Sequence, residues 1–170
     1  MSPLSVLCLI LPFPLLFIVH ELEEITVFRR WIIRGAPSLS ARFPRMEPLL
    51  SHLSTFTTGA FCIAAAEELL LLLGVTGYVL IDGPQCLRVW ATVFLAFALH
   101  QAGHVVQAII VRSYVPGLLT AILLLPYTGY TLFCLHLVLY PSELLLLTLA
   151  GAVLLVLNLI FAHWLGKSIA

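Results

Sequence analysis

The chain has 170 residues, of which 62% are hydrophobic and only 9% are charged, and its mean hydropathy is +1.13. Soluble domains carry about 25% charged residues, so this composition excludes a water-soluble globule, and most of the chain must face lipid or other apolar helices. Basic and acidic residues balance to a net charge of zero. Because no basic run is present that could follow a phosphate backbone, we expect no nucleic-acid partner.

Five apolar runs follow one another along the chain, each close to the roughly 20 residues that a membrane-spanning helix needs. A long polar stretch, 29–48, separates the first two runs, turn-forming residues separate the others, and Pro126 interrupts the fourth. The predicted spans are about 4–28, 52–80, 87–111, 118–139 and 143–166. We therefore expect one all-α domain over residues 1–170, a polytopic membrane helix bundle of about five transmembrane helices.

Basic residues predict the orientation of this bundle. With five spans, the connections after the first and third spans lie on the same side as the C-terminus. That side collects Arg29, Arg30, Arg34, Arg42, Arg45, Arg112 and Lys167 and leaves only Arg88 on the other. The positive-inside rule makes it cytoplasmic, so the prediction is N-out/C-in, in a bacterial plasma membrane or a eukaryotic endomembrane. The first span lacks the charged start and cleavage site of a signal peptide, and we expect it to be retained.

Ionisable side chains lie inside the predicted spans, where each costs at least about 2.5 kcal/mol and so needs a partner or a function. At about 100° per residue, His20, Glu23 and Glu24 share one helix face, whereas Glu21 lies about 100° from His20 and is expected to face lipid headgroups or a partner. The other groups are Glu67, Glu68, His100, His104 and His163. Counted from the span ends, most of them share one layer in the cytoplasmic half of the bundle. Gln101, Gln107 and Asn158 are expected to form hydrogen bonds between helices.

The chemistry of this layer favours a metal. Four ionised carboxylates in a low-dielectric bundle repel one another, and the spans hold no lysine or arginine beside them. Two divalent cations would balance the charge, and carboxylates with histidines suit iron, manganese or zinc, as in di-iron bundles. We therefore expect two divalent metal ions, with iron favoured over zinc or manganese. The predicted ligands are His20, Glu23, Glu24, Glu67, Glu68, His100, His104 and His163, and the predicted catalytic residues are Glu24, Glu68 and Arg112.

Arg112 follows His104 by about two helical turns, from where its guanidinium could bind a phosphate or carboxylate group of a substrate. An anchor at the cytoplasmic face explains the same residue equally well.

Several motifs resemble the HXXEE-domain family of small membrane proteins. The similarity begins at His20-Glu21-Leu22-Glu23-Glu24 and continues with His100-x-x-x-His104. It then includes Tyr114-Val115-Pro116-Gly117 with Leu118-Leu119-Thr120-Ala121, and it ends at Pro126. The resemblance implies a membrane protein that shares its ligand residues with the family, and it implies no particular reaction. Membrane prenyl-protein proteases are less similar, since Leu72 stands where their Glu-Glu-x-x-x-Arg motif has arginine. The eight-histidine pattern of membrane desaturases does not fit a chain with 6 histidines.

The leading functional hypothesis is a metal-dependent membrane enzyme, an oxidoreductase, that acts on an apolar lipid- or terpenoid-like molecule. A metal-dependent membrane hydrolase and a metal-free isomerase or cyclase that uses glutamate and histidine are the alternatives. A proton-coupled transporter or an assembly subunit is a third class, although five spans leave little room for two alternating halves. The expected partners are the lipid bilayer and an apolar small molecule, and homo-oligomer formation stays open.

Overall fold

The structure is a computed structural model that describes residues 3–83 and 86–170, and within these ranges every regular element is a helix. The elements are α1 (Pro3–Ile10), α2 (Pro12–Arg42), the short 3-10 helix η1 (Pro44–Met46), α3 (Glu47–Ser54), α4 (Thr58–Asp82), α5 (Leu87–Val111), α6 (Leu118–Leu123), α7 (Leu125–Val138) and α8 (Pro141–Ile169). The predicted all-α helix bundle is confirmed.

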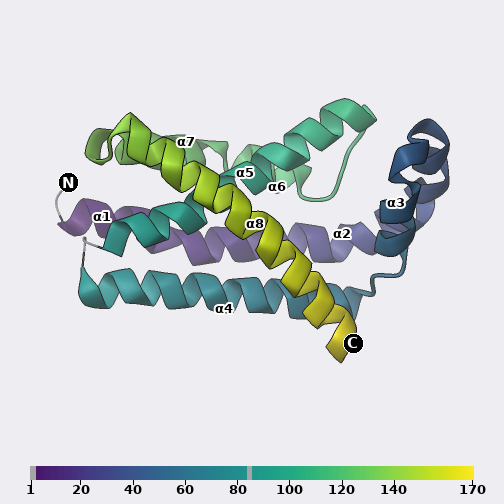
Figure 1. The fold of residues 1–170 in the computed structure, drawn as a ribbon, viewed down its shortest axis with the longest axis horizontal. Helices are drawn as coiled ribbons and strands as arrows, with labels where there is room; N and C mark the ends of the chain where they lie inside the picture. Colours follow the sequence, from purple (N-terminus) through teal and green to yellow (C-terminus); the bar gives the residue numbers. More distant parts are fainter. Residues whose placement is uncertain (1–2, 84–85) are drawn as a thin grey trace.

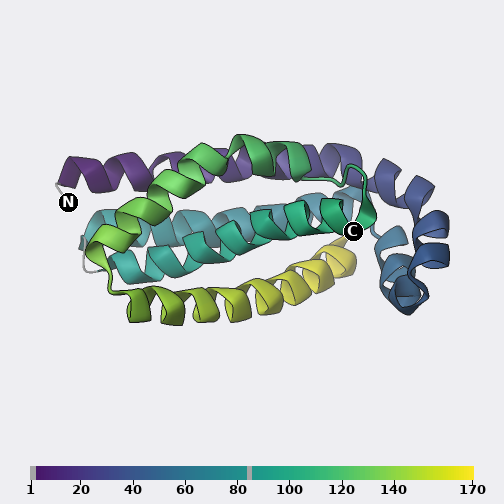
Figure 2. The same cartoon turned by 90° about the horizontal axis from the view of Figure 1, so that it is seen from above.

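The long helices lie lengthwise beside one another. The N-terminus and the turn between α7 and α8 lie at one end of the bundle, and α3, the α5–α6 loop and the C-terminus lie at the other (Figures 1 and 2). Three described helices, α4, α5 and α8, are long and apolar enough to cross a membrane. The first predicted span is not among these three because α2 carries three glutamates in its first half. The fourth is not among them because it consists of two helices of 6 and 14 residues.

A proline and an arginine contact explain where several of these elements begin and end. Pro126 lies in the first turn of α7, where its missing N–H is tolerated, and the chain is therefore broken at Leu124. The polar stretch after residue 28 is not a loop, because α2 continues as a helix to Arg42. The Arg42 guanidinium there donates to the carbonyl oxygens of Val111 at 2.7 Å and Ile110 at 3.1 Å. These bonds satisfy free carbonyls at the C-terminus of α5 and attach α2 to it.

Small residues bring α8 close to its neighbours. The helix crosses α4 and α5 on one side of the bundle (Figure 1). A Cβ atom added to Gly166 would lie 2.3 Å from the Ala60 carbonyl oxygen, and one on Gly151 would lie 2.8 Å from that of Thr92. Only glycine allows the backbones to approach so closely, as is common between membrane helices. The opposite face of α8 exposes leucine, valine and isoleucine side chains, as expected of a helix in lipid.

Aromatic side chains fill the space between α2 and α5 and set these helices against each other. Phe13 packs edge-on against Trp90 and Phe94, with ring centroids 5.6 and 5.5 Å apart. Two turns further along α2, His20 meets Phe97 of α5 at 5.4 Å. The next turn of α5 brings His100 opposite His20. The aromatic core therefore fixes which polar residues of the two helices face one another.

Candidate metal centre

Four side chains from α2 and α5 meet in the bundle, His20, Glu24, His100 and His104. Each offers one ligand atom, and these atoms all lie within 4.8 Å of one another. The Glu24 Oε1 atom is 3.3 Å from Nε2 of His20, 3.2 Å from Nε2 of His100 and 2.7 Å from Nε2 of His104. Three imidazole nitrogens are thus directed at one carboxylate oxygen.

The geometry of the α-helix produces this arrangement from two pairs of residues. His20 and Glu24 are four residues apart on α2, and His100 and His104 are four apart on α5. Side chains at this spacing lie above one another on the same helix face. Each helix therefore contributes two side chains that could bind a metal, and the aromatic core sets the two helix faces opposite each other.

Two features of the cluster suit a cation. The Nε2 atoms of His100 and His104 are 2.9 Å apart, so without a cation one ring must donate a proton to the other. His20 is fully buried, and its Nε2 atom has no partner in hydrogen-bonding geometry within the described part of the chain. Unpaired buried nitrogens are costly. Imidazoles with a carboxylate and no thiolate form a ligand set that suits iron, manganese or zinc.

Glu23, the neighbour of Glu24, points away from the cluster and binds the start of α6. Its carboxylate accepts hydrogen bonds from the Thr120 amide at 2.7 Å, the Leu119 amide at 3.2 Å and the Thr120 hydroxyl at 2.5 Å. The Tyr114 hydroxyl is a further donor, also at 2.5 Å. Desolvation and this bond to Glu23 raise the pKa of Tyr114 above its usual value, so the phenol stays protonated and donates.

Thr120 connects Glu23 to the cluster. Its Oγ1 atom lies 2.8 Å from Nδ1 of His20. Because the hydroxyl donates its proton to Glu23, its oxygen accepts from the His20 Nδ1–H group, which leaves the lone pair on Nε2. Carboxylates and hydroxyls behind a histidine ligand commonly fix its tautomer in this way. His20 and Glu24 therefore belong to the cluster, whereas Glu23 lies behind it and is connected to it through Thr120.

The loop between α5 and α6 closes the cluster on one side. Gly117 has a φ of 80°, and a Cβ atom there would lie 2.7 Å from Cε1 of His104 and 2.8 Å from Oε1 of Glu24. The carbonyl oxygen of Tyr114, in the same loop, accepts a hydrogen bond from Trp31 of α2 at 2.9 Å. The loop is therefore attached to α2 while its glycine backbone lies directly against the ligand atoms.

The other predicted site residues lie outside this cluster of four. Glu67 accepts a hydrogen bond from Asn158 of α8 at 3.3 Å. His163 packs against the Phe56 ring with centroids 4.7 Å apart. Arg112 is exposed at the C-terminus of α5. Of the residues expected to join helices, Gln101 accepts a hydrogen bond from Thr128 of α7 at 2.7 Å.

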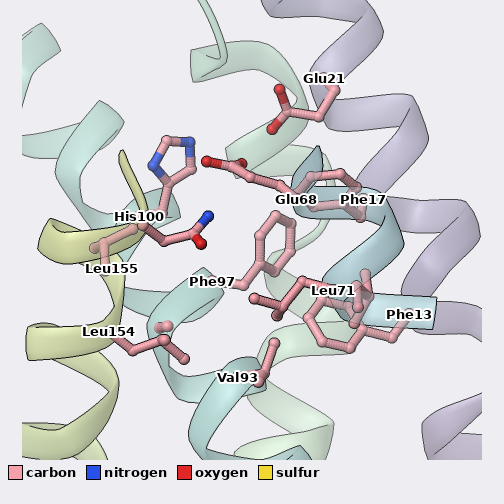
Figure 3. A pocket seen from close by; sticks show the side chains of 13 residues that line it. Phe13, Phe17, Glu21, Glu68, Leu71, Val93, Phe97, His100, Leu154 and Leu155 are labelled. Carbon is pink, nitrogen blue, oxygen red and sulfur yellow. The ribbon is translucent and has the colours of Figure 1, made fainter. Parts of the chain in front are cut away.

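Two pockets beside the cluster share lining residues. The inner pocket, of about 70 Å³, extends between α2, α4, α5 and α8, and the outer pocket, of about 370 Å³, extends towards α3. Glu21, Glu68 and His100 line both pockets, and Figure 3 shows these side chains entering the inner pocket from three helices. Glu24, His104 and His163 also line the outer pocket. Arg112 is absent from the described linings of both.

The expectation that Glu21 faces headgroups is wrong. Its side chain is inside the bundle, and the residue is only 7% exposed. The helix period placed it on a different face from His20 correctly, but α4 covers that face and brings Glu68 opposite. Thr120 and Tyr114 were not predicted as site residues, and the one signal in the sequence that points to them is the family motif in which they stand. Their positions depend on the turn at Gly117.

Comparison with known proteins identifies one family. The family described as "Protein of unknown function with HXXEE motif" matches residues 11–131. No curated protein and no solved structure matches the chain. The matched region contains all four residues of the cluster together with Glu23, Tyr114, Gly117 and Thr120. The chain therefore belongs to the HXXEE family.

Proposed function

We propose that this protein is a metal-dependent membrane enzyme whose ion is held by His20, Glu24, His100 and His104. The observation that carries the proposal is the convergence of three imidazole nitrogens on one buried carboxylate oxygen, within 4.8 Å. A polar group at this depth is costly unless it is paired or coordinates a metal. We propose one ion in place of the two expected from sequence, since Glu24 alone of the four glutamates belongs to the cluster.

The number of ligands favours iron, with manganese as the next choice. Four protein ligands would complete the tetrahedral shell of zinc, which is typical of structural sites. A six-coordinate ion would keep two positions for substrate or dioxygen. When bound, such an ion would supply redox and Lewis-acid chemistry. We therefore favour an oxidoreductase. A zinc hydrolase and a metal-free isomerase or cyclase are the alternatives, and turnover that survives chelation would favour the last.

The surrounding residues support an apolar, lipid- or terpenoid-like substrate. Apart from its polar end, the outer pocket is lined mainly by aliphatic and aromatic side chains, and its volume is within the range of small-molecule sites. Glu68 lies beside the cluster without belonging to it and is our candidate for proton transfer. We further propose five spans in the N-out/C-in orientation, with α1–α2 and α6–α7 as broken spans, which places the site in the cytoplasmic half of the membrane.

Metal analysis of protein purified from iron-supplemented cells tests the proposal. We expect about one iron per chain in the wild type, and loss of the metal in His100→Ala and His104→Ala, each of which removes a ligand. His136→Ala is the matched control, because this exposed histidine of α7 lies outside the cluster. Wild-type protein without bound metal would refute the proposal. About two ions per chain, one of them lost in His163→Ala, would instead support the two-ion expectation.

A further inference from the structure

Glu21 is a buried carboxyl group for which the described part of the chain supplies no hydrogen-bonding partner. It is 7% exposed, and among the described residues none forms a hydrogen bond or an ion pair with it. Its side chain points into the inner pocket towards Glu68 and His100 (Figure 3). A buried polar group that the protein leaves unpaired is expected to bind something else.

The surroundings of Glu21 are apolar on two sides. Phe13, Phe17 and Phe97 line the inner pocket, and aromatic and aliphatic side chains of α2, α3 and α4 line most of the outer one. Glu21, Glu68 and His100 belong to both linings and so lie between the two pockets. A molecule that occupies both pockets would therefore carry its polar group between two apolar parts.

Charge limits what that polar group can be. The described lining of the two pockets contains no lysine or arginine, whereas it contains the carboxyl groups of Glu21, Glu24 and Glu68. Glu21 and Glu68 lie outside the cluster of four, so a phosphate or carboxylate held between these two carboxyl groups would meet like charge in a low-dielectric site. An ammonium group would have to give up its hydration inside the bundle. A hydroxyl group can donate to a carboxylate or accept from a carboxylic acid, and it brings no charge.

We infer that the two pockets together bind an uncharged long-chain or isoprenoid alcohol, whose hydroxyl group is held by Glu21 beside Glu68. The inference deepens the proposed function, because it names the substrate class of the same site and rests on that function for the claim that the alcohol reacts. Binding itself depends on Glu21 and the pocket walls. It can therefore be measured separately from the metal.

Competition binding in nanodiscs of phosphatidylcholine tests the inference. Radiolabelled tetradecanol is bound to the full chain and displaced with unlabelled tetradecanol, tetradecanoic acid, tetradecyl phosphate or tetradecylamine. We expect the alcohol to compete at least about tenfold better than either anion, because like charges side by side are costly. Equal competition by the acid or the phosphate, or stronger competition by the amine, would overturn the inference.

Five variants locate the binding site. Glu21→Leu should weaken tetradecanol binding about tenfold, the usual effect of one lost buried hydrogen bond. Glu21→Gln should restore binding, and Glu47→Leu on exposed α3 is the control. Ala65→Phe should block the outer pocket, which Ala65 lines, whereas Ala66→Phe on the exposed face of α4 should not. Unchanged binding in both Glu21→Leu and Ala65→Phe refutes the inference.

Metal content measured on the same samples separates this inference from the proposed function. We expect Glu21→Leu to keep its metal, since Glu21 does not belong to the cluster of four. Alcohol binding that depends on Glu21 in a protein that never binds metal would refute the enzyme proposal and leave the inference standing. A protein that binds metal but shows no preference for the alcohol would refute the inference and leave the enzyme proposal standing.

Discussion

Replacing Thr120 by valine tests how His20 is prepared to bind a metal. The change keeps the size of the side chain and removes the hydroxyl that joins His20 Nδ1 at 2.8 Å to Glu23 Oε2 at 2.5 Å. Two hydrogen bonds are lost, one of them to a carboxylate, which corresponds to about 2–4 kcal/mol. The His20 proton is then free to move to Nε2, the nitrogen that would bind the ion. Loss of such a supporting partner lowers metal affinity by about 10–100-fold.

The assay is a competition titration of iron against a chelator of known affinity, on purified wild type and variants. Thr120→Ser keeps the hydroxyl and should retain most of the affinity. Thr76→Val is the matched control, because the Thr76 hydroxyl is buried in α4 without a hydrogen-bond partner in the described residues. If Thr120→Val binds iron as tightly as Thr76→Val does, the tautomer of His20 is not set through Thr120.

Three further predictions concern the loop and the helix contacts. Tyr114→Phe should lower the free energy of unfolding by about 1–2 kcal/mol. Because the pKa of Tyr114 is raised in the folded protein, the stabilisation that its hydroxyl provides should be constant below a pH of about 10 and should be lost above it. Urea unfolding in detergent measures both effects, and a contribution that grows with pH would contradict the assignment. Gly117→Ala should abolish metal binding in the titration above, whereas Gly103→Ala, with open space at its Cβ, should not; equal affinities would contradict the close approach. Gly166→Val should lower the melting temperature in detergent far more than Gly77→Val, which meets open space; similar melting temperatures would show that α8 does not need this contact.

The sequence by itself determined the class of protein and the relative directions of side chains along each helix. Hydropathy is a property of composition, so the helical membrane bundle followed from it. The helix period is a property of the backbone, so the pairing of His20 with Glu24 and of His100 with His104 also followed. These pairs became the cluster of four.

Only the tertiary structure decided which neighbouring glutamate enters the site. Glu23 and Glu24 differ by about 100° around one helix, and the sequence does not say how that helix is rotated against its neighbours. The Phe13 packing fixes the rotation of α2 against α5, and the loop at Gly117 places α6 where Thr120 binds Glu23. The position of Glu21 was decided in the same way, because α4 covers a face that was expected to meet headgroups. Periodicity gives angles within one helix, whereas a site made from several helices depends on how they pack.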